Sequence, residues 1–247
     1  MRSVGPARQK LLPVAILAGG MGSRLRPYTD EIPKALIEVQ GEPFIGYQLR
    51  LLSSQGVRKV VICAGYLGRL IQEYVGAGDE FGLAVSFSFD GPRLLGTGGA
   101  IKKALPLLGA AFFVVYGDAY LRCDYQAVQW AFQKSGKKGL MTVYHNQNQH
   151  DKSNVELRDG VIRSYDKIFP SPAMQHIDYG LSVFRASAFD GLSPDASVDL
   201  ADIYQELLRS GHLAAFEVQN RFYEIGSPQG LQEFREVASS FSRKSDK

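Results

Sequence analysis

The distribution of apolar residues predicts alternating strands and helices through the first half of the chain. Runs that are apolar throughout, or that alternate apolar with small or polar residues, are typical of strands with buried faces. They span residues 14–17, 57–64, 84–89 and 110–116. Apolar residues recur at helical spacing at 43–56, 67–75 and 100–108. This βαβ order predicts an α/β fold with a Rossmann-like, mixed, mostly parallel sheet flanked by helices, which binds ligands at the carboxyl ends of its strands.

The second half of the chain is less regular. Residues 140–146 predict a strand, and 154–166 predict a hairpin because Asp159-Gly160 is a strong turn signal. A helix is expected after Asp199, a good N-cap residue, and a closing helix from Gln229 to about Ser239.

The segment after the first strand carries the strongest indication of function. Gly19, Gly20 and Gly22 follow the apolar run, and glycines let backbone N–H groups approach a ligand closely. Arg24 and Lys34 add two cations. A glycine-rich turn with two cations predicts a phosphate site.

Two other phosphate-binding motifs do not match this segment. A dinucleotide fingerprint requires a third glycine where Leu25 stands and a helix where Pro27 and Pro33 prevent one. A P-loop would end in Gly-Lys-Ser/Thr, which is absent here. An ordinary dinucleotide-dependent oxidoreductase is therefore excluded.

The same segment resembles the signature of the sugar-1-phosphate nucleotidyltransferases, also called nucleotide-sugar pyrophosphorylases. The signature reads Leu-Ala-Gly-Gly-x-Gly-x-Arg-Leu-x-Pro-x-Thr and then Pro-Lys-x-Leu, and it stands at residues 17–29 and 33–36. Ala35 departs from the Pro that the family often has there. The resemblance covers residues 14–238 and implies a single GT-A-like catalytic domain that joins a sugar 1-phosphate to a nucleoside triphosphate and releases pyrophosphate.

The resemblance assigns the nucleotide to two glycine-rich segments. Arg24 would neutralise the departing pyrophosphate, and Lys34 would lie near the α-phosphate. The residues placed around the triphosphate are Leu17, Ala18, Gly19, Gly20 and Gly22. The second segment enters a helix, whose free N–H groups and positive dipole end suit a ligand. The family uses it for base and ribose, which implies that the base pocket is lined by Gly96, Thr97 and Gly98.

Two acidic residues are candidate Mg²⁺ ligands. Asp118 follows Gly117 at the carboxyl end of the most apolar strand, where a hard cation is readily held. Family members carry a Mg²⁺ ligand at this place and a second one in a Tyr/Trp-x-Asp-Ile-Gly-Thr-Pro segment. Here that segment is Tyr-Glu-Ile-Gly-Ser-Pro, so Glu224 stands in the place of the aspartate.

The sugar 1-phosphate is assigned to two further segments. The family has a Glu-Lys pair where this chain has Asp166 and Lys167, which implies that the lysine reaches the sugar phosphate and the shorter acid a sugar hydroxyl. Relatives show Asn-Ala-Gly where this chain has Asp178, Tyr179 and Gly180. An acid in place of the amide accepts but does not donate, which predicts a changed sugar preference or a different strand register.

Composition sets the remaining limits. The 247 residues carry 28 basic and 25 acidic side chains, a balance that argues against nucleic acid and for a small anionic substrate. Cys63 and Cys123, the only cysteines, predict reduced structural thiols in a cytoplasmic protein. The sequence has no run apolar enough to span a bilayer. Exposed apolar residues such as Trp130 would allow a homodimer.

The domain boundaries follow from these assignments. We expect a disordered lead at 1–12, a catalytic domain at 13–240 and a polar tail at 241–247. Within the domain, 13–135 is the nucleotide-binding half and 136–240 the sugar-binding half.

The motifs and the short chain are most similar to mannose- and heptose-1-phosphate guanylyltransferases, so GTP is the favoured nucleotide. Uridylyl- and thymidylyltransferases share many of these residues and remain alternatives. A third hypothesis, motivated by Ala35, Asp178, Tyr179 and Glu224, is a degenerate member that binds a nucleotide sugar and regulates a partner.

Overall fold

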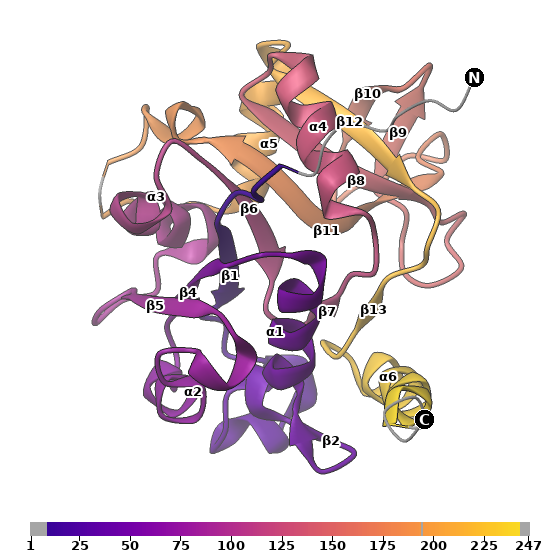
Figure 1. Ribbon diagram of the computed structural model, residues 1–247. Helices are drawn as coiled ribbons and strands as arrows, with labels where there is room; N and C mark the ends of the chain where they lie inside the picture. Colours follow the sequence, from indigo (N-terminus) through magenta and orange to yellow (C-terminus); the bar gives the residue numbers. More distant parts are fainter. Residues whose placement is uncertain (1–8, 194, 243–247) are drawn as a thin grey trace, which may run out of the picture.

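The computed structural model describes residues 9–193 and 195–242, which build a nine-stranded sheet with helices on both faces (Figure 1). The strands of this sheet are β1 (Val14–Ala18), β4 (Lys59–Ala64), β5 (Ala84–Phe89), β6 (Ala111–Tyr116), β8 (Gly139–His145), β9 (Val155–Arg158), β10 (Val161–Tyr165), β11 (His176–Arg185) and β12 (Leu213–Val218). Two small sheets lie apart from it, formed by β2 (Glu38–Val39) with β3 (Glu42–Pro43) and by β7 (Ala119–Tyr120) with β13 (Tyr223–Glu224). The predicted fold class, a mixed α/β sheet flanked by helices, is confirmed.

The first half of the chain contributes four parallel strands in the order β5-β4-β1-β6. Ile16 of β1 pairs with Ile62 of β4 on one side and with Val115 of β6 on the other. The chain moves outward from β1 to β4 and β5 and then crosses back to β6, so the strand order reverses between β1 and β6. A ligand crevice is expected outside the carboxyl ends of strands at such a reversal.

The second half extends the same sheet with antiparallel pairings. β11 pairs antiparallel with β6 and with β8, and β12 adds a parallel edge strand to β8. The β11–β8 register shifts between Asp178 and Ser182, where Gly180 has a φ of 92°. The bulge lies between residues 181–185, which pair with β6 of the first half, and residues 176–178, which pair with β8.

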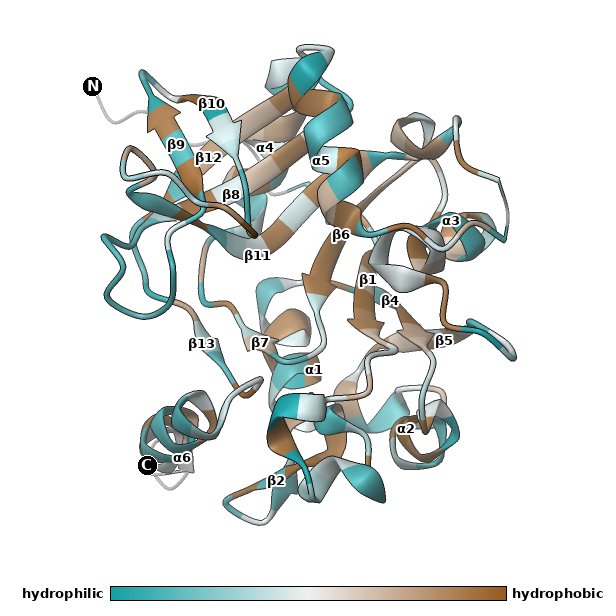
Figure 2. Ribbon diagram, turned by 180° about the vertical axis from the view of Figure 1, so that it is seen from behind, coloured by the Kyte–Doolittle hydropathy of each residue, from teal (hydrophilic) through white to brown (hydrophobic). Residues whose placement is uncertain are grey.

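In the described part of the chain, six α-helices cover the sheets. They are α1 (Phe44–Gln55), α2 (Gly68–Val75), α3 (Gly96–Leu108), α4 (Tyr125–Ser135), α5 (Leu200–Arg209) and α6 (Pro228–Ser242). Along β1, Val14 and Ile16 enter the apolar cluster under α1, α2 and α4, whereas Ala15 and Leu17 enter the cluster under α3 and α5. Figure 2 shows the result: the central strands are apolar, while the helices carry polar residues as well. The apolar run read from the sequence is thus a strand buried on both faces.

The last helix packs on a third apolar cluster. Phe234 of α6 lies with its ring centroid 4.9 Å from that of Phe44 in α1 and 5.1 Å from that of Tyr120 in β7. This packing holds α6 below the first half of the sheet (Figure 1) and fixes the position of β13, which precedes it.

Most predicted elements are confirmed within one or two residues at each end. The strand at 84–89 lies where the sequence predicts it. The predicted hairpin turn is also present, and both of its residues, Asp159 and Gly160, have a positive φ. Pro43 caps α1 instead of beginning it. The closing helix begins at Pro228 and continues through Ser242.

The N-terminal segment is held more firmly than expected. Leu11 is buried, and the backbone of residues 9–12 exchanges hydrogen bonds with the side-chain amides of Gln126 and Gln129 in α4. The disorder predicted for residues 9–12 is therefore wrong, because two glutamines of α4 satisfy this backbone. Residues 1–8 and 243–247 of the predicted lead and tail lie outside the described residues.

Within the described ranges, none of the helices combines the length and the apolar character that crossing a bilayer requires. Cys63 and Cys123 are free thiols, and burial raises the pKa of each to about 12. Both thiols therefore stay protonated at neutral pH, as structural cysteines do. Trp130 is 47% exposed on α4.

Candidate active site

A pocket opens at the carboxyl ends of β1 and β6, where the strand order reverses. It contains about 820 Å³ of empty space, part of it open to solvent. Its lining includes eight residues that the sequence assigns to the nucleotide or to catalysis, namely Leu17, Ala18, Gly19, Gly20, Lys34, Gly96, Thr97 and Asp118. Three others, Gly22, Arg24 and Gly98, are not part of this lining.

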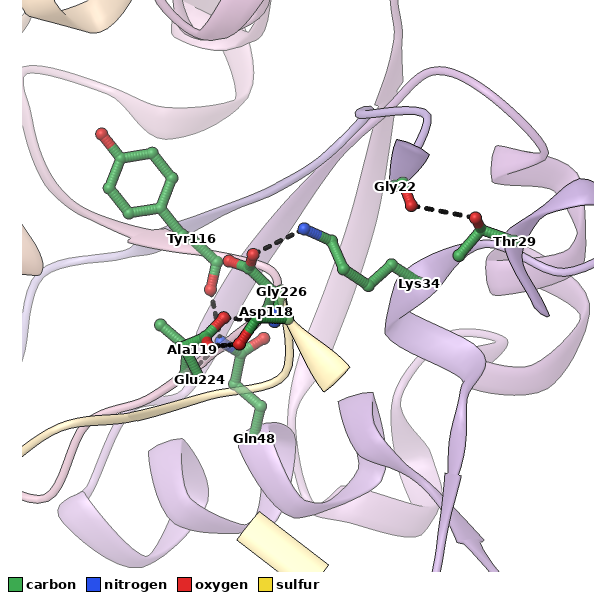
Figure 3. Close-up of polar contacts among 10 residues, drawn as sticks. Gly22, Thr29, Lys34, Gln48, Tyr116, Asp118, Ala119, Glu224 and Gly226 are labelled. Atoms are coloured by element: carbon green, nitrogen blue, oxygen red, sulfur yellow. Dashed lines mark hydrogen bonds and ion pairs between the residues drawn. The ribbon is translucent and has the colours of Figure 1, made fainter. Parts of the chain in front are cut away.

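The loop from β1 to α1 winds through three 3₁₀ turns at Ser23–Leu25, Tyr28–Asp30 and Lys34–Leu36, in place of a regular helix. Gly22 starts this path with a φ of 62°, which few other residues adopt. Its carbonyl oxygen accepts hydrogen bonds from the Leu25 N–H and the Thr29 hydroxyl, each 2.9 Å long (Figure 3). Gly22 therefore shapes the loop from outside the pocket.

Lys34 and Asp118 form an ion pair in the pocket. The Lys34 Nζ lies 2.6 Å from the Asp118 Oδ2, and both side chains are 21% exposed (Figure 3). Gly117 lets β6 approach β1 closely at this point, since a Cβ there would lie 2.8 Å from the Leu17 carbonyl oxygen. The fold thus joins two residues that the sequence places 84 positions apart.

Gly226 marks the point where three predicted site residues meet. A Cβ at this glycine would lie 2.6 Å from Glu224 Oε2, 2.8 Å from Asp118 Oδ2 and 2.9 Å from an Arg24 guanidinium nitrogen. The strand pairing explains the meeting, because Glu224 of β13 lies opposite Ala119 of β7 and the Ile225 N–H donates to the Asp118 carbonyl oxygen. Arg24, outside the pocket lining, nevertheless lies beside both carboxylates.

The two carboxylates fit a Mg²⁺ ion. Mg²⁺ is commonly held by one or two protein carboxylates together with substrate phosphates. Across residues 9–193 and 195–242 no group of three or more His, Cys, Asp or Glu side chains could hold a metal, so phosphates would complete the shell. The longer Glu224 side chain folds back, and its carboxylate accepts hydrogen bonds from the Gly226 N–H and the Ser227 hydroxyl while remaining beside Asp118.

The start of α3 differs from the sequence prediction. Gly96, Thr97 and Gly98 belong to the first turn of the helix rather than preceding it. The N–H groups of Gly98 and Gly99 both donate to the Val198 carbonyl oxygen, at 2.8 and 3.2 Å. The prediction of free N–H groups is therefore wrong for these two glycines, because a segment of the second half docks on this helix end.

The predicted sugar-phosphate residue Lys167 is paired with Asp199, the residue that the sequence predicts as a helix N-cap. Its Nζ lies 2.7 Å from Asp199 Oδ2, and Asp199 also accepts hydrogen bonds from the Ala201 N–H and the Thr97 hydroxyl. Burial raises the pKa of Asp199, but the hydrogen bonds and Lys167 outweigh it and hold the pKa below its usual value. Asp199 caps α5 and also joins the two halves at the pocket.

The carboxylate of Asp166 binds the backbone of the residues that follow it. Its Oδ1 accepts hydrogen bonds from the N–H groups of Ile168 and Phe169, at 2.8 and 2.9 Å, which lower its pKa. The exposed side chains of Ile168 and Phe169 follow directly. Asp166 thus fixes the backbone turn that carries Lys167.

Asp178 lies at the bulge of β11, half-buried. Burial raises its pKa to about 6, against the opposing effects of the Gly180 N–H, which donates to Oδ1 at 3.0 Å, and of the Lys167 charge. Asn154, which no sequence motif indicates, holds this bulge. Its Oδ1 accepts a hydrogen bond from the Asp178 N–H and its carbonyl oxygen accepts one from the Asp166 N–H, both at 2.9 Å. Gly180 is part of this turn and is buried.

The pocket also contains a buried acid, Asp90, that is not among the site residues predicted from the sequence. Asp90 is 7% exposed, lines the pocket beside Leu94 and Cys63, and accepts a hydrogen bond from the Leu95 N–H at 3.1 Å. Burial raises its pKa. A usable signal existed, since Asp90 directly follows the predicted strand at 84–89 just as Asp118 follows the strand at 110–116.

A family model described as nucleotidyl transferase matches residues 14–238. The chain is 30% identical over 233 residues to the N-acetylmuramate alpha-1-phosphate uridylyltransferase of Neisseria meningitidis serogroup B, covering 92% of this chain and 98% of the relative. It is 26% identical over 223 residues to the D-glycero-alpha-D-manno-heptose 1-phosphate guanylyltransferase of Campylobacter jejuni, covering 89% and 96%. The chain spans about 60% of the length of the mannose-1-phosphate guanyltransferase of Gibberella zeae, at 27% identity over 87% of this chain.

Solved structures share the fold. A Bacillus anthracis protein described as a glucose-1-phosphate thymidylyltransferase superposes with a TM-score of 0.82 at 20% identity, covering 92% of this chain and 95% of that one. HddC from Yersinia pseudotuberculosis superposes with a TM-score of 0.77 at 23% identity, covering 92% and 99%. At these identities the superpositions establish the architecture and say nothing of substrates.

Proposed function

The chain belongs to the nucleotidyl transferase family, and from that premise we propose that it transfers the nucleotidyl group of GTP to a sugar 1-phosphate of the mannose or heptose type and releases pyrophosphate. Family membership and the relatives support sugar-1-phosphate nucleotidyl transfer as the reaction class. The identity of the nucleotide as GTP and of the sugar as mannose or heptose goes beyond the reaction class and is proposed here.

The observation that carries the proposal is the arrangement of charge around the pocket. Lys34 and Asp118 meet at 2.6 Å at the strand reversal, and Arg24 lies beside the same carboxylate. Lys167 lies on the other half, joined through Asp199 to Thr97 of the pocket. Two polyanionic substrates require cations on both sides of the reacting phosphorus, and Lys34 and Lys167, which come from different halves of the chain, support the proposal.

The reaction needs no covalent nucleophile on the protein. A phosphate oxygen of the sugar 1-phosphate attacks the α-phosphorus, a new P–O bond forms, and the bond to the β-phosphate breaks as pyrophosphate leaves. The protein contributes positioning and charge neutralisation, which are the main sources of catalysis in phosphoryl chemistry. We assign Lys34 to the α-phosphate, Arg24 to the departing pyrophosphate and Lys167 to the sugar phosphate.

The carboxylates of Asp118 and Glu224 would hold Mg²⁺, and members of this family generally use a divalent metal. When bound, the ion would neutralise charge on the reacting phosphates. The backbone of Gly19 and Gly20 would lie against the triphosphate, since both line the pocket and Gly20 has open space around it. Gly96 and Thr97 would lie against the base and ribose.

The choice of GTP rests on the motifs and on relatives named as guanylyltransferases for heptose and mannose 1-phosphates. UTP is the second candidate, because the relative with 30% identity over nearly its whole length is named as a uridylyltransferase for N-acetylmuramate 1-phosphate. Nucleotide and sugar are therefore scanned independently in the test.

The test measures pyrophosphate release with Mg²⁺ for GTP, UTP, dTTP, CTP and ATP, each against mannose, heptose, glucose, galactose, N-acetylhexosamine and N-acetylmuramate 1-phosphates. Release with GTP and a mannose or heptose 1-phosphate, lost in Asp118→Asn, is the expected result. Release with UTP and N-acetylmuramate 1-phosphate would replace the proposed substrates and keep the reaction class. No release with any pair, together with measurable nucleotide binding, would favour the regulatory binding protein.

A further inference from the structure

A buried glutamine lies directly beneath the turn that carries Asp118. Gln48 comes from α1, where it is 3% exposed among apolar neighbours such as Ile45 and Leu49. Its side chain leaves the helix toward the carboxyl end of β6, as Figure 3 shows. Nothing in the sequence pattern sets Gln48 apart from the rest of α1, since a polar residue on a helix normally faces solvent.

The amide of Gln48 binds the turn on both sides of Asp118. Its Nε2 donates one hydrogen bond to the carbonyl oxygen of Tyr116 and one to that of Ala119, each 2.8 Å long. These are the first and last residues of the four-residue turn in which Gly117 and Asp118 are central. Two carbonyl dipoles that converge on one point repel each other, so the NH₂ group between them fixes the spacing of the turn.

Two further hydrogen bonds of the turn come from its own backbone. The Gly117 N–H donates to Leu17 in β1, and the Asp118 carbonyl oxygen accepts from Ile225, both at 2.9 Å. These bonds attach the turn to its two neighbours, the strand on one side and the segment of Glu224 on the other. Gln48 supplies the contact from below, where α1 supports the turn.

The oxygen of the same amide makes no comparable contact. Within the described part of the chain, Gln48 Oε1 is buried without a hydrogen-bond partner. An unsatisfied buried acceptor is unfavourable and uncommon in native structures. A lysine could also donate to both carbonyls but would bury a charge. A side-chain amide offers two donors from one nitrogen without a charge, and of the two amide residues glutamine has the longer side chain.

We propose that Gln48 is a positioning residue for the transfer reaction. It fixes the orientation of the Asp118 carboxylate by binding the carbonyl oxygens of Tyr116 and Ala119. The inference rests on the proposed function, in which Asp118 holds Mg²⁺ and faces Lys34. Removing a residue that hydrogen-bonds to a metal ligand typically lowers the affinity for the metal by about 10- to 100-fold. Gln48 acts through Asp118 and does not touch substrate.

The test uses Gln48→Met, which keeps the length of the side chain and removes both donors. A matched control is Gln129→Met, because Gln129 is a buried glutamine that also bonds backbone, on α4 and against residues 10 and 12, away from the pocket. Three quantities are measured on the full chain: Mn²⁺ affinity by electron paramagnetic resonance with nucleotide present, kcat and KM for pyrophosphate release, and the melting temperature.

We expect Gln48→Met to weaken Mn²⁺ binding by about tenfold or more and to lower kcat by at least the same factor, while the KM for the nucleotide changes less than threefold. Gln129→Met should lower the melting temperature and leave Mn²⁺ affinity and kcat within twofold of wild type. Gln48→Asn, which keeps an amide but is too short to reach both carbonyls, should give a smaller loss in the same direction and serves if Gln48→Met does not fold.

Equal behaviour of the two Met variants, with Mn²⁺ affinity and kcat unchanged in both, would overturn the proposal and leave Gln48 with a purely structural role. A wild-type protein that binds Mn²⁺ but releases no pyrophosphate would overturn the proposed function, and the Mn²⁺ affinities alone would then decide whether Gln48 positions Asp118.

Discussion

Replacing Asp178 by asparagine should stabilise the protein at neutral pH, and the size of the effect can be worked out. Burial raises the pKa of Asp178 from 3.8 to about 6. The folded state therefore binds this proton more tightly than the unfolded state, so stability falls as the pH rises from about 3.8 to about 6 and the full cost of the charge is present above that range. A shift of about 2 pKa units corresponds to about 3 kcal/mol at pH 7.5, and to about 1 kcal/mol at pH 4.5, where most of the unfolded-state carboxyl is ionised but the folded one is protonated.

Asparagine removes the charge and keeps an oxygen that can accept from the Gly180 N–H. The variant should therefore gain up to about 3 kcal/mol over wild type at pH 7.5, and this gain should shrink by about 2 kcal/mol at pH 4.5. Urea denaturation of both proteins at pH 4.5, 6.0 and 7.5, followed by circular dichroism, measures the difference directly. Comparing the variant with wild type at each pH cancels the titration of all other groups.

Asp199→Asn is the matched control with the opposite sign. The pKa of Asp199 lies below its usual value, so its ionised form stabilises the fold above that range and this contribution is lost as the pH falls. The control variant should be less stable than wild type at pH 7.5 and approach it at low pH. A stability difference for Asp178→Asn that is the same at all three pH values would refute the assignment of a buried charge at this bulge.

Three further substitutions test the site. Gly226→Ala places a methyl group within 2.9 Å of atoms of Asp118, Glu224 and Arg24. Because misplacing reacting groups by about 1 Å can cost roughly 100-fold in rate, we expect turnover to fall by about that factor. Turnover that stays within threefold of wild type would show that these three side chains do not need to meet. Arg24→Met should lower kcat far more than the melting temperature, because the side chain is exposed, and equal losses in both would count against its role on pyrophosphate. Lys167→Met should raise the KM for the sugar 1-phosphate about tenfold or more with little change in nucleotide affinity, and steady-state kinetics with each substrate varied in turn would expose a contrary pattern.

Several features of the site could be predicted from short stretches of sequence. A run of apolar residues from Val14 to Leu17 followed by glycines predicts a buried strand that ends at a ligand, and Asp118 after a second such run predicts an acid at the same sheet edge. The structure confirms both strands and their common sheet edge, because hydrophobic periodicity and glycine act within a few residues of the chain. The resemblance to a known family added the roles, which local patterns do not contain.

Other features depended on contacts between distant segments. Glu224 comes beside Asp118 only because β13 pairs with β7, and Asp199 comes to Lys167 only because a loop of the second half docks on the start of α3. That docking also occupies the N–H groups of Gly98 and Gly99, which the sequence had presented as free. A residue's own neighbours do not indicate such partners.

The sequence by itself therefore determined the strands, the glycine turns and which charged side chains end at the carboxyl edge of the sheet, since these follow from local hydrophobic pattern and backbone freedom. Tertiary structure alone decided which of those charges pair and which polar groups are buried. Gln48 makes the difference plain: its neighbours in sequence give only an amphipathic helix, and its two hydrogen bonds exist because α1 packs beneath residues 68 and 71 positions further along the chain.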